Sequence, residues 1–346
     1  MPVPPTSFRA AYSVPAANPA SAGLRYADLD GLRGLLAVGV VLLHLGLNSF
    51  VSRAFGWPGM ALELLIEVFF ILSGFVLAHS VAKNGAFLPF AVRRVFRLAP
   101  LYLVTTLAAA WLLAAPMRPF DWLMAAPFVL RGAINFPAWS IAFEFWLPLA
   151  AVLLLRGPPS WAVRPLLAIA VTALAVLDAR VAEGAGFQVQ RATLGLGIGA
   201  LLCWARLAVP GRPEAWLALL LAALALAKVW PPAAAIVPIA GIAAIISCTR
   251  GSSWLSLPPV HWLGAISYSL YLVHIPVRDA FAMALGFAID HSPPAKLAIL
   301  AASIAAAAAL TLVIEIPANR LGHRLSRRMT TQQGLASALT QPIAKP

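Results

Sequence analysis

Apolar stretches of about 20 residues recur along almost the whole chain, and this repetition limits the fold more than any other feature. Each stretch is long enough to cross a hydrocarbon core of about 30 Å as an α-helix. Hydrophobic residues make up 61% of the 346 positions and charged residues 11%, whereas soluble domains have about 45–50% and about 25%. The sequence therefore excludes an ordinary soluble domain and predicts a protein whose main solvent is the lipid bilayer.

The apolar stretches predict an all-α, polytopic transmembrane helix bundle. Only helices and closed barrels satisfy backbone polar groups in lipid, and these stretches lack the alternation of barrel strands. About ten spans are expected, with approximate limits 31–50, 60–82, 95–115, 138–155, 161–179, 192–209, 214–230, 232–248, 262–286 and 296–317. The segment 121–130 is too short to cross and is predicted to be re-entrant or interfacial.

The distribution of basic residues predicts that both termini are cytoplasmic. With this orientation, 16 of the 25 Lys and Arg residues lie inside and eight outside, as the positive-inside rule requires. Residues 1–25 are predicted to be a disordered cytoplasmic tail, 26–320 the membrane domain and 321–346 a cytoplasmic C-terminal tail. The net charge of +13 is spread between apolar stretches, so it indicates orientation and no nucleic-acid partner.

The two cysteines, Cys203 and Cys248, both lie in apolar stretches. They provide neither a disulfide framework nor a spaced set of metal ligands. Small buried hydrophobic residues are the simplest interpretation of both. We therefore expect no metal.

Two ionisable residues of the first span, Arg33 and His44, share one helix face. They are eleven positions apart, which leaves them about 20° apart around the helix and about 16 Å apart along it. Ionisable residues in spans are costly and usually face a cavity or a partner. The alternative is an arginine snorkelling to the interface and a hydrogen-bonded core histidine.

The spans containing residues 60–82 and 138–155 contribute two carboxylates, Glu67 and Glu144. The predicted limits place both at the level of His44, about 9–10 Å below the outer face. A buried imidazole near a carboxylate can act as a general base toward a hydroxyl. A polar cluster that only packs helices together is the alternative.

The span 262–286 carries a second polar group, Ser267, Tyr268, Tyr271 and His274. Ser267, Tyr271 and His274 lie at i, i+4 and i+7, on one helix face. They could line a pocket for an acceptor, or their polar groups could bond between helices. Pro276 follows His274 closely and disfavours a continuous helix at this point.

Three arginines, Arg93, Arg94 and Arg97, stand before the span 95–115, on the predicted cytoplasmic side. Such a cluster can bind phosphates through charge-assisted hydrogen bonds. Positive-inside orientation alone would also place arginines here. We expect Glu315, near the inner end of the last span, to be a structural partner of one of these arginines.

Five short motifs follow one another along the chain. They are Leu29-Asp30-Gly31-Leu32-Arg33-Gly34 with His44, Glu67-Val68-Phe69-Phe70-Ile71-Leu72-Ser73-Gly74-Phe75, Arg94-Val95-Phe96-Arg97-Leu98-Ala99-Pro100, Trp139-Ser140 with Glu144, and Ile266-Ser267-Tyr268-Ser269-Leu270-Tyr271-Leu272-Val273-His274. In this order, over residues 29–274, they resemble the signature of the acyltransferase-3 family of integral membrane O-acyltransferases. Each motif alone is weak evidence for the family, whereas the five motifs in the family's order are specific evidence for it.

The resemblance implies an enzyme of the bacterial cytoplasmic (inner) membrane. Its donor would be acyl-CoA, commonly acetyl-CoA, on the cytoplasmic side. Its acceptor would be a hydroxyl of an envelope glycan, a glycolipid or a secondary metabolite. Carried to the matching positions, it implies that His44 is the catalytic histidine, Arg33 its essential companion, and Arg94 and Arg97 donor-side residues.

The chain departs from the family pattern after Glu144. Phe145 and Trp146 replace a polar pair, and Leu147-Pro148 stands where an aromatic residue often ends the motif. Members of the family also exist with an appended hydrolase-like domain, which the sequence to Pro346 lacks. The acceptor is therefore expected to be handled by the bundle and its loops.

Two other classes of protein, a transporter or flippase and a non-catalytic partner subunit, fit the sequence less well than an enzyme. A transporter or flippase would also carry buried charges, but it would be expected to show broken spans in corresponding halves of the chain. A non-catalytic partner subunit has no need of an aligned histidine and carboxylates. The polar residues therefore favour an enzyme in which Glu67 or Glu144 orients the His44 imidazole.

Overall fold

The structure is a computed structural model that describes residues 27–47, 50, 56, 58–83, 87–125, 133–154, 160–179, 185–250, 253–286 and 292–339. All regular elements within these ranges are helical. The all-α prediction is confirmed. The predicted tail 1–25 and the second half of the segment 121–130, residues 126–130, lie outside the described residues.

Each predicted span overlaps one observed helix or a run of two or three consecutive helices. The long helices are α2 (Ala27–His44), α4 (Leu65–Lys83), α5 (Phe87–Leu112), α7 (Trp139–Leu154), α8 (Ser160–Ala179), α9 (Ala185–Ala205), α10 (Pro213–Ala227), α11 (Ile236–Cys248), α12 (Pro258–Leu285), α13 (Pro293–Leu310) and α14 (Ile316–Leu339). The short elements are α6 (Pro119–Trp122), the 3-10 helices η1 (Leu62–Leu64), η3 (Phe136–Ala138), η4 (Pro231–Ala235) and η5 (Trp254–Ser256), and the π-helix η7 (Thr311–Glu315).

Among the described residues, five helical segments are long and apolar enough to cross a membrane. They are Leu62–Val81, Phe87–Leu112, Ser160–Ala179, Pro231–Cys248 and Pro293–Thr331. Two shorter apolar helices, Phe136–Val152 and Pro213–Ala227, lie among them. The chain is therefore an integral membrane protein. The number of ten spans and the cytoplasmic termini stay predictions.

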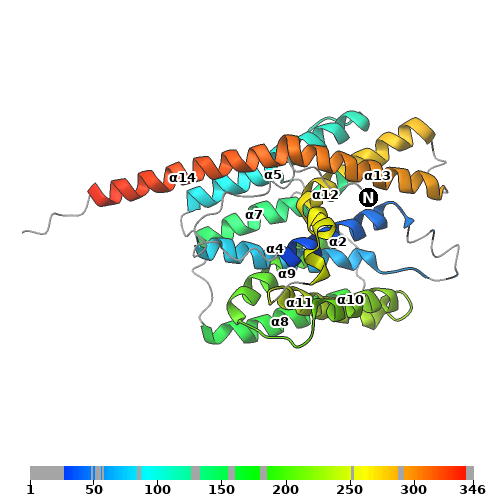
Figure 1. Cartoon of the computed structure of the whole chain (residues 1–346), viewed down its shortest axis with the longest axis horizontal. Helices are drawn as coiled ribbons and strands as arrows, with labels where there is room; N and C mark the ends of the chain where they lie inside the picture. The colour runs from blue at the N-terminus through cyan, green and yellow to red at the C-terminus, as the bar shows by residue number, and fades with distance from the viewer. Residues whose placement is uncertain are drawn as a thin grey trace, which may run out of the picture.

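The helices form one bundle in which most of them run along the longest axis of the molecule (Figure 1). Helix α4 packs against α9, α2 against α12, and α5 against α14. Helices α5, α13 and α14 form one side of the bundle, and α8, α10 and α11 form the opposite side (Figure 1). The last helix, α14, continues beyond the bundle as an extension of α13 (Figure 1).

Glycines allow two pairs of central helices to approach closely. A Cβ atom on Gly34 of α2 would overlap the backbone of α12 at Gly264. A Cβ atom on Gly74 of α4 or Gly199 of α9 would likewise overlap the backbone of the facing helix. Small residues at such contacts are typical of helices that associate in lipid. The close approach of α2 and α12 brings the first predicted span, with Arg33 and His44, against the polar residues 267–274 of α12.

Two helices extend further than the sequence indicated. Helix α5 begins at Phe87, so the arginine cluster lies within its first turns and not before it. Helix α12 continues through Pro276 to Leu285, which makes the expected interruption near His274 wrong. Proline removes one intrahelical bond, to the carbonyl four residues earlier. That carbonyl, Leu272 O, accepts a hydrogen bond of 2.9 Å from Asn135 Nδ2 instead. The carbonyl therefore stays hydrogen-bonded although the proline interrupts the bonding within the helix.

Candidate active site

His44 forms a pair with His274 where α2 meets α12. His44 Nδ1 lies 2.9 Å from His274 Nε2, and the two rings stack with centroids 5.1 Å apart. The Nδ1 atom of His274 lies 3.1 Å from Leu270 O. His274 is fully buried, and His44 is half-buried beside the Phe136 ring.

These contacts define the tautomers of both imidazoles. A carbonyl oxygen can only accept, so His274 Nδ1 carries its proton and donates to Leu270 O. The Nε2 atom of His274 is then the acceptor, and His44 Nδ1–H donates to it. His44 Nε2 therefore keeps its lone pair. A base needs such a free nitrogen, held in place by a hydrogen bond at the other ring nitrogen.

The two carboxylates that were expected to orient His44 are engaged elsewhere. Glu67 is fully buried and forms an ion pair with Arg191 of α9. Glu144 accepts a hydrogen bond of 3.0 Å from Ser73 Oγ and lies 3.9 Å from Arg94. These contacts do not match the hypothesis that Glu67 or Glu144 holds the imidazole, because His274 occupies that position.

Glu144 also lies deeper toward the arginine cluster than the predicted limits placed it. Ser140, one helical turn earlier in α7, is hydrogen-bonded to Tyr271 at 2.8 Å, and Tyr271 precedes His274 by three residues. Glu144 lies one further turn along α7, where its carboxylate is 3.9 Å from Arg94 of α5. Span limits alone cannot give this depth, because they contain no information on how far each helix is shifted along its neighbours.

The hydroxyl groups of α12 bond within the bundle. Tyr271 bonds to Ser140 and stacks on Phe69, with ring centroids 5.8 Å apart. Tyr268 donates to Leu98 O at 2.7 Å, and Ser267 donates to Gly264 O of its own helix at 2.8 Å. These contacts correspond to the helix-packing alternative. An acceptor-binding role for this group stays a prediction.

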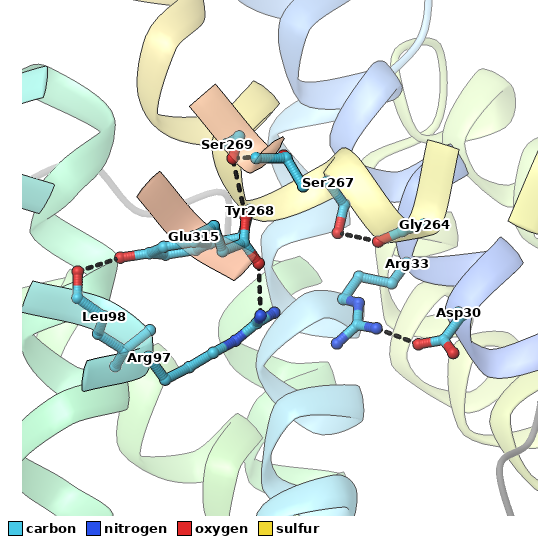
Figure 2. Close-up of polar contacts among 10 residues, drawn as sticks. Asp30, Arg33, Arg97, Leu98, Gly264, Ser267, Tyr268, Ser269 and Glu315 are labelled. Carbon is cyan, nitrogen blue, oxygen red and sulfur yellow. Dashed lines mark hydrogen bonds and ion pairs between the residues drawn. The ribbon is translucent and has the colours of Figure 1, made fainter. Parts of the chain in front are cut away.

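Arg97 is held by a polar network around Glu315 (Figure 2). Its guanidinium forms an ion pair with Glu315 and lies 5.6 Å from the centre of the Tyr268 ring. Glu315 also accepts a hydrogen bond of 2.8 Å from Ser269 Oγ. The expectation that Glu315 is a partner of one of the arginines is confirmed. The π-helix η7 ends at Glu315, and such local widening of a helix is frequent at functional sites.

Arg94 is held by a backbone carbonyl that a proline releases. Pro148 lies inside α7 and has no N–H for the carbonyl of Glu144, four residues earlier. Arg94 Nε donates to this Glu144 oxygen at 2.9 Å. The departure from the family pattern at Leu147-Pro148 thus creates an acceptor for an arginine of the cluster. The third member, Arg93, donates to Ser326 Oγ of α14.

The side chains of Arg33 and Arg97 are more accessible than that of Arg94. Figure 2 shows that they extend toward one another from α2 and α5, with Arg33 also paired to Asp30. The side chains of Arg33 and Arg97 are 27% and 35% exposed, whereas that of Arg94 is 11% exposed. All three arginines interact electrostatically with the Glu144 carboxylate. The structure therefore brings Arg33, predicted from the first span, together with the arginines of α5.

Sequence reasoning missed three members of these networks: Asp178, Arg191 and His274 as a partner of His44. Arg191 pairs with Glu67 and lies 3.9 Å from Asp178, whose carboxylate is fully buried. Asp178 and Arg191 stand at the ends of their predicted spans, where a charged residue is read as a loop signal. Asp178 lies one residue inside the predicted span 161–179. This position within a span is the one feature of the sequence that could have marked it as a buried charge.

In the part of the chain that the structure describes, no group of three or more His, Cys, Asp or Glu side chains is arranged to hold a metal ion. The fold and this site define an integral membrane protein with a histidine pair and an arginine cluster. Helix α12 contacts both groups, because His274 pairs with His44 and Tyr268 lies against Arg97. The acyltransferase domain family matches residues 26–314. The chain therefore belongs to the acyltransferase-3 family, as the five motifs suggested.

Two curated relatives resemble parts of the chain. Acyltransferase MdmB of Streptomyces mycarofaciens is 32% identical over 146 residues, which cover 35% of this chain and 37% of that protein. Protein 2 in picA locus of Rhizobium radiobacter is 31% identical over 188 residues, which cover 45% of this chain and 94% of that protein. The chain thus matches little more than a third of the length of MdmB. No solved structure gives a significant match.

Proposed function

We propose that this protein transfers an acyl group, commonly acetyl, from acyl-CoA to a hydroxyl group of an envelope glycan, a glycolipid or a secondary metabolite. The observation that carries the proposal is the His44–His274 pair within a chain of the acyltransferase family. The free Nε2 of His44 is the atom that would receive a proton. The bacterial cytoplasmic membrane is the proposed location.

The proposed reaction needs only His44, the acceptor hydroxyl and the thioester of the donor to account for every bond and proton. His44 Nε2 removes the proton of the acceptor hydroxyl while its oxygen attacks the thioester carbonyl carbon. The new C–O bond forms, the C–S bond breaks, and the proton on Nε2 passes to the leaving thiolate. His274 stabilises the imidazolium that forms between these events, because its Nε2 accepts from His44 Nδ1–H. Direct transfer and a relay through an acyl-histidine both fit this arrangement.

The arginines are proposed to bind the phosphates of the donor. Arg33 and Arg97 support this role best, because their guanidinium groups converge and remain partly exposed. Arg93 donates to Ser326 of α14, and Arg94 donates to the Glu144 carbonyl of α7. These two arginines are proposed to fix the neighbouring helices around the donor site and to add positive charge to it. Guanidinium groups suit phosphates because they donate paired, charge-assisted hydrogen bonds.

The chemistry can be tested with purified protein, radiolabelled acetyl-CoA and an extract of envelope glycans. His44→Ala should lower the transfer rate by about 10²–10⁴-fold, the usual contribution of a positioned general base. His323→Ala is the matched control, because this histidine is exposed on α14. Transfer by His44→Ala at the wild-type rate would remove His44 from the mechanism. Label that crosses a vesicle membrane without becoming attached to an acceptor would favour a transporter instead.

The donor site has its own test. Arg97→Ala should raise the apparent KM for acetyl-CoA by about tenfold or more, because a charge-assisted hydrogen bond to phosphate is worth about 1.5–3 kcal/mol. Acetyl-pantetheine, which carries no diphosphate, should not distinguish the variant from the wild type. An equal loss with both donors would assign Arg97 to the support of the bundle.

A further inference from the structure

A cavity lies between the start of helix α8 and the end of helix α9. Its volume is about 380 Å³. Helix α8 is on the side of the bundle opposite α5 and α14 (Figure 1), so this cavity is separate from the arginine site described above. Its polar and aromatic lining comes from the start of α8 and the end of α9: Ser160, Trp161, Arg164, Trp204 and Arg206.

The two arginines of this cavity have no anionic partner within the described residues. Arg164 and Arg206 are both exposed, and no carboxylate lines the cavity in the part of the chain described. Arg206 follows the last residue of α9 with a φ of 46°, a left-handed conformation that residues other than glycine seldom adopt. The cavity therefore offers two guanidinium groups to a ligand from outside the protein.

The tryptophans place the cavity at the boundary between lipid and water. Trp161 is 80% exposed and Trp204 is 42% exposed. Helix α8 is one of the segments apolar enough to span the membrane, and it begins at Ser160. The cavity thus lies at the end of a span, where tryptophan rings are enriched because they have an apolar body and a polar N–H. The basic residues of this end are predicted to be cytoplasmic.

We propose that this cavity binds the phosphodiester headgroup of an anionic membrane phospholipid. Arg164 and Arg206 donate charge-assisted hydrogen bonds to the phosphate oxygens, and the Ser160 hydroxyl supplies another donor. The two tryptophan rings pack against the glycerol and the upper part of the acyl chains. A zwitterionic headgroup is disfavoured, because its ammonium group would be repelled by two unpaired guanidinium groups. Basic pockets between spans recognise anionic headgroups in this way.

Native mass spectrometry of the purified full chain can test this site. Protein is mixed with equal amounts of phosphatidylglycerol and phosphatidylcholine in detergent, and the bound lipids are counted. The wild type should retain phosphatidylglycerol preferentially. Arg164→Gln together with Arg206→Gln should reduce its retention by about tenfold or more, the effect of losing charge-assisted hydrogen bonds. Arg324→Gln with Arg328→Gln is the matched control, since both are exposed arginines on α14 and the charge change is the same.

Three results would overturn the proposal. They are unchanged lipid retention in the Arg164/Arg206 variant, an equal loss in the α14 control, and displacement of the lipid by adenosine 3′,5′-bisphosphate, which would assign the cavity to a nucleotide. Should the double variant fold poorly, the wild type and the conservative variant Arg164→Lys test the site by thermal unfolding. The melting temperature of the wild type should rise more with phosphatidylglycerol than with phosphatidylcholine, and Arg164→Lys should weaken this difference. Equal melting temperatures in the two lipids would contradict an anionic headgroup site.

Discussion

At the scale of single residues, the His44–His274 pair carries the strongest chemical information. Leu270 O sets the tautomer of His274, and His274 in turn sets the tautomer of His44. His274 is thus a positioning residue, since it acts on the proposed reaction through the ring of His44. Its removal should affect the rate without affecting the binding of acyl-CoA.

We expect His274→Ala to lower kcat by about 10–100-fold while the KM for acetyl-CoA changes little. The reason is that His44 loses the acceptor that fixes its ring, although its Nε2 can still accept a proton. The double variant His44→Ala/His274→Ala should be no slower than His44→Ala, because residues that act as a unit are non-additive. Steady-state kinetics of the three variants measure this. Fully additive losses would mean that His274 acts independently of His44.

Another residue-scale prediction concerns Arg191, which pairs with Glu67 and lies near Asp178. Arg191→Ala leaves two buried carboxylates without their guanidinium. Breaking a buried pair in this way costs about 3–5 kcal/mol, so the melting temperature and the yield in detergent should both fall. Arg212→Ala is the control, because Arg212 is 79% exposed in its pair with Glu214 and should matter little. Equal melting temperatures for the two variants would contradict a stabilising role of the buried cluster.

At the scale of helices, prolines within spans create acceptors that side chains of other helices use. Pro276 releases Leu272 O for Asn135, and Pro148 releases Glu144 O for Arg94. The prolines therefore specify contacts between helices, in addition to any local bending. In lipid this exchange matters more than in water, because no solvent can satisfy a released carbonyl.

A double-mutant cycle tests the exchange at Pro276. Asn135→Leu should lower stability by about 1–3 kcal/mol, because the Leu272 carbonyl is left buried without a donor. Adding Pro276→Ala should restore much of this loss, since the new N–H can close the intrahelical bond. The readout is the melting temperature of the purified variants. If Pro276→Ala lowers stability equally in both backgrounds, Asn135 does not compensate for the proline.

At the scale of the whole molecule, orientation in the membrane remains the main prediction. The excess of basic residues on one side predicts that the arginine cluster of α5 and the end of helix α14 lie in the cytoplasm. A fluorescent protein fused after Pro346 should therefore fluoresce in cells, and an alkaline phosphatase fused there should be inactive. The opposite pattern would place the donor site outside, where acyl-CoA is absent, and would remove the support for acyl-CoA as the donor.

Hydropathy and motif order were enough to predict a membrane helix bundle, the family, and Glu315 as a partner of the arginine cluster. These properties depend on composition, segment length and local spacing, which a single sequence contains. It could not show which polar residues meet. His44 pairs with His274 because glycines bring α2 against α12, and Glu67 pairs with Arg191 because α4 packs on α9. The rotation and shift of each helix against its neighbours result from many packing contacts between distant segments, so only the tertiary structure decides them.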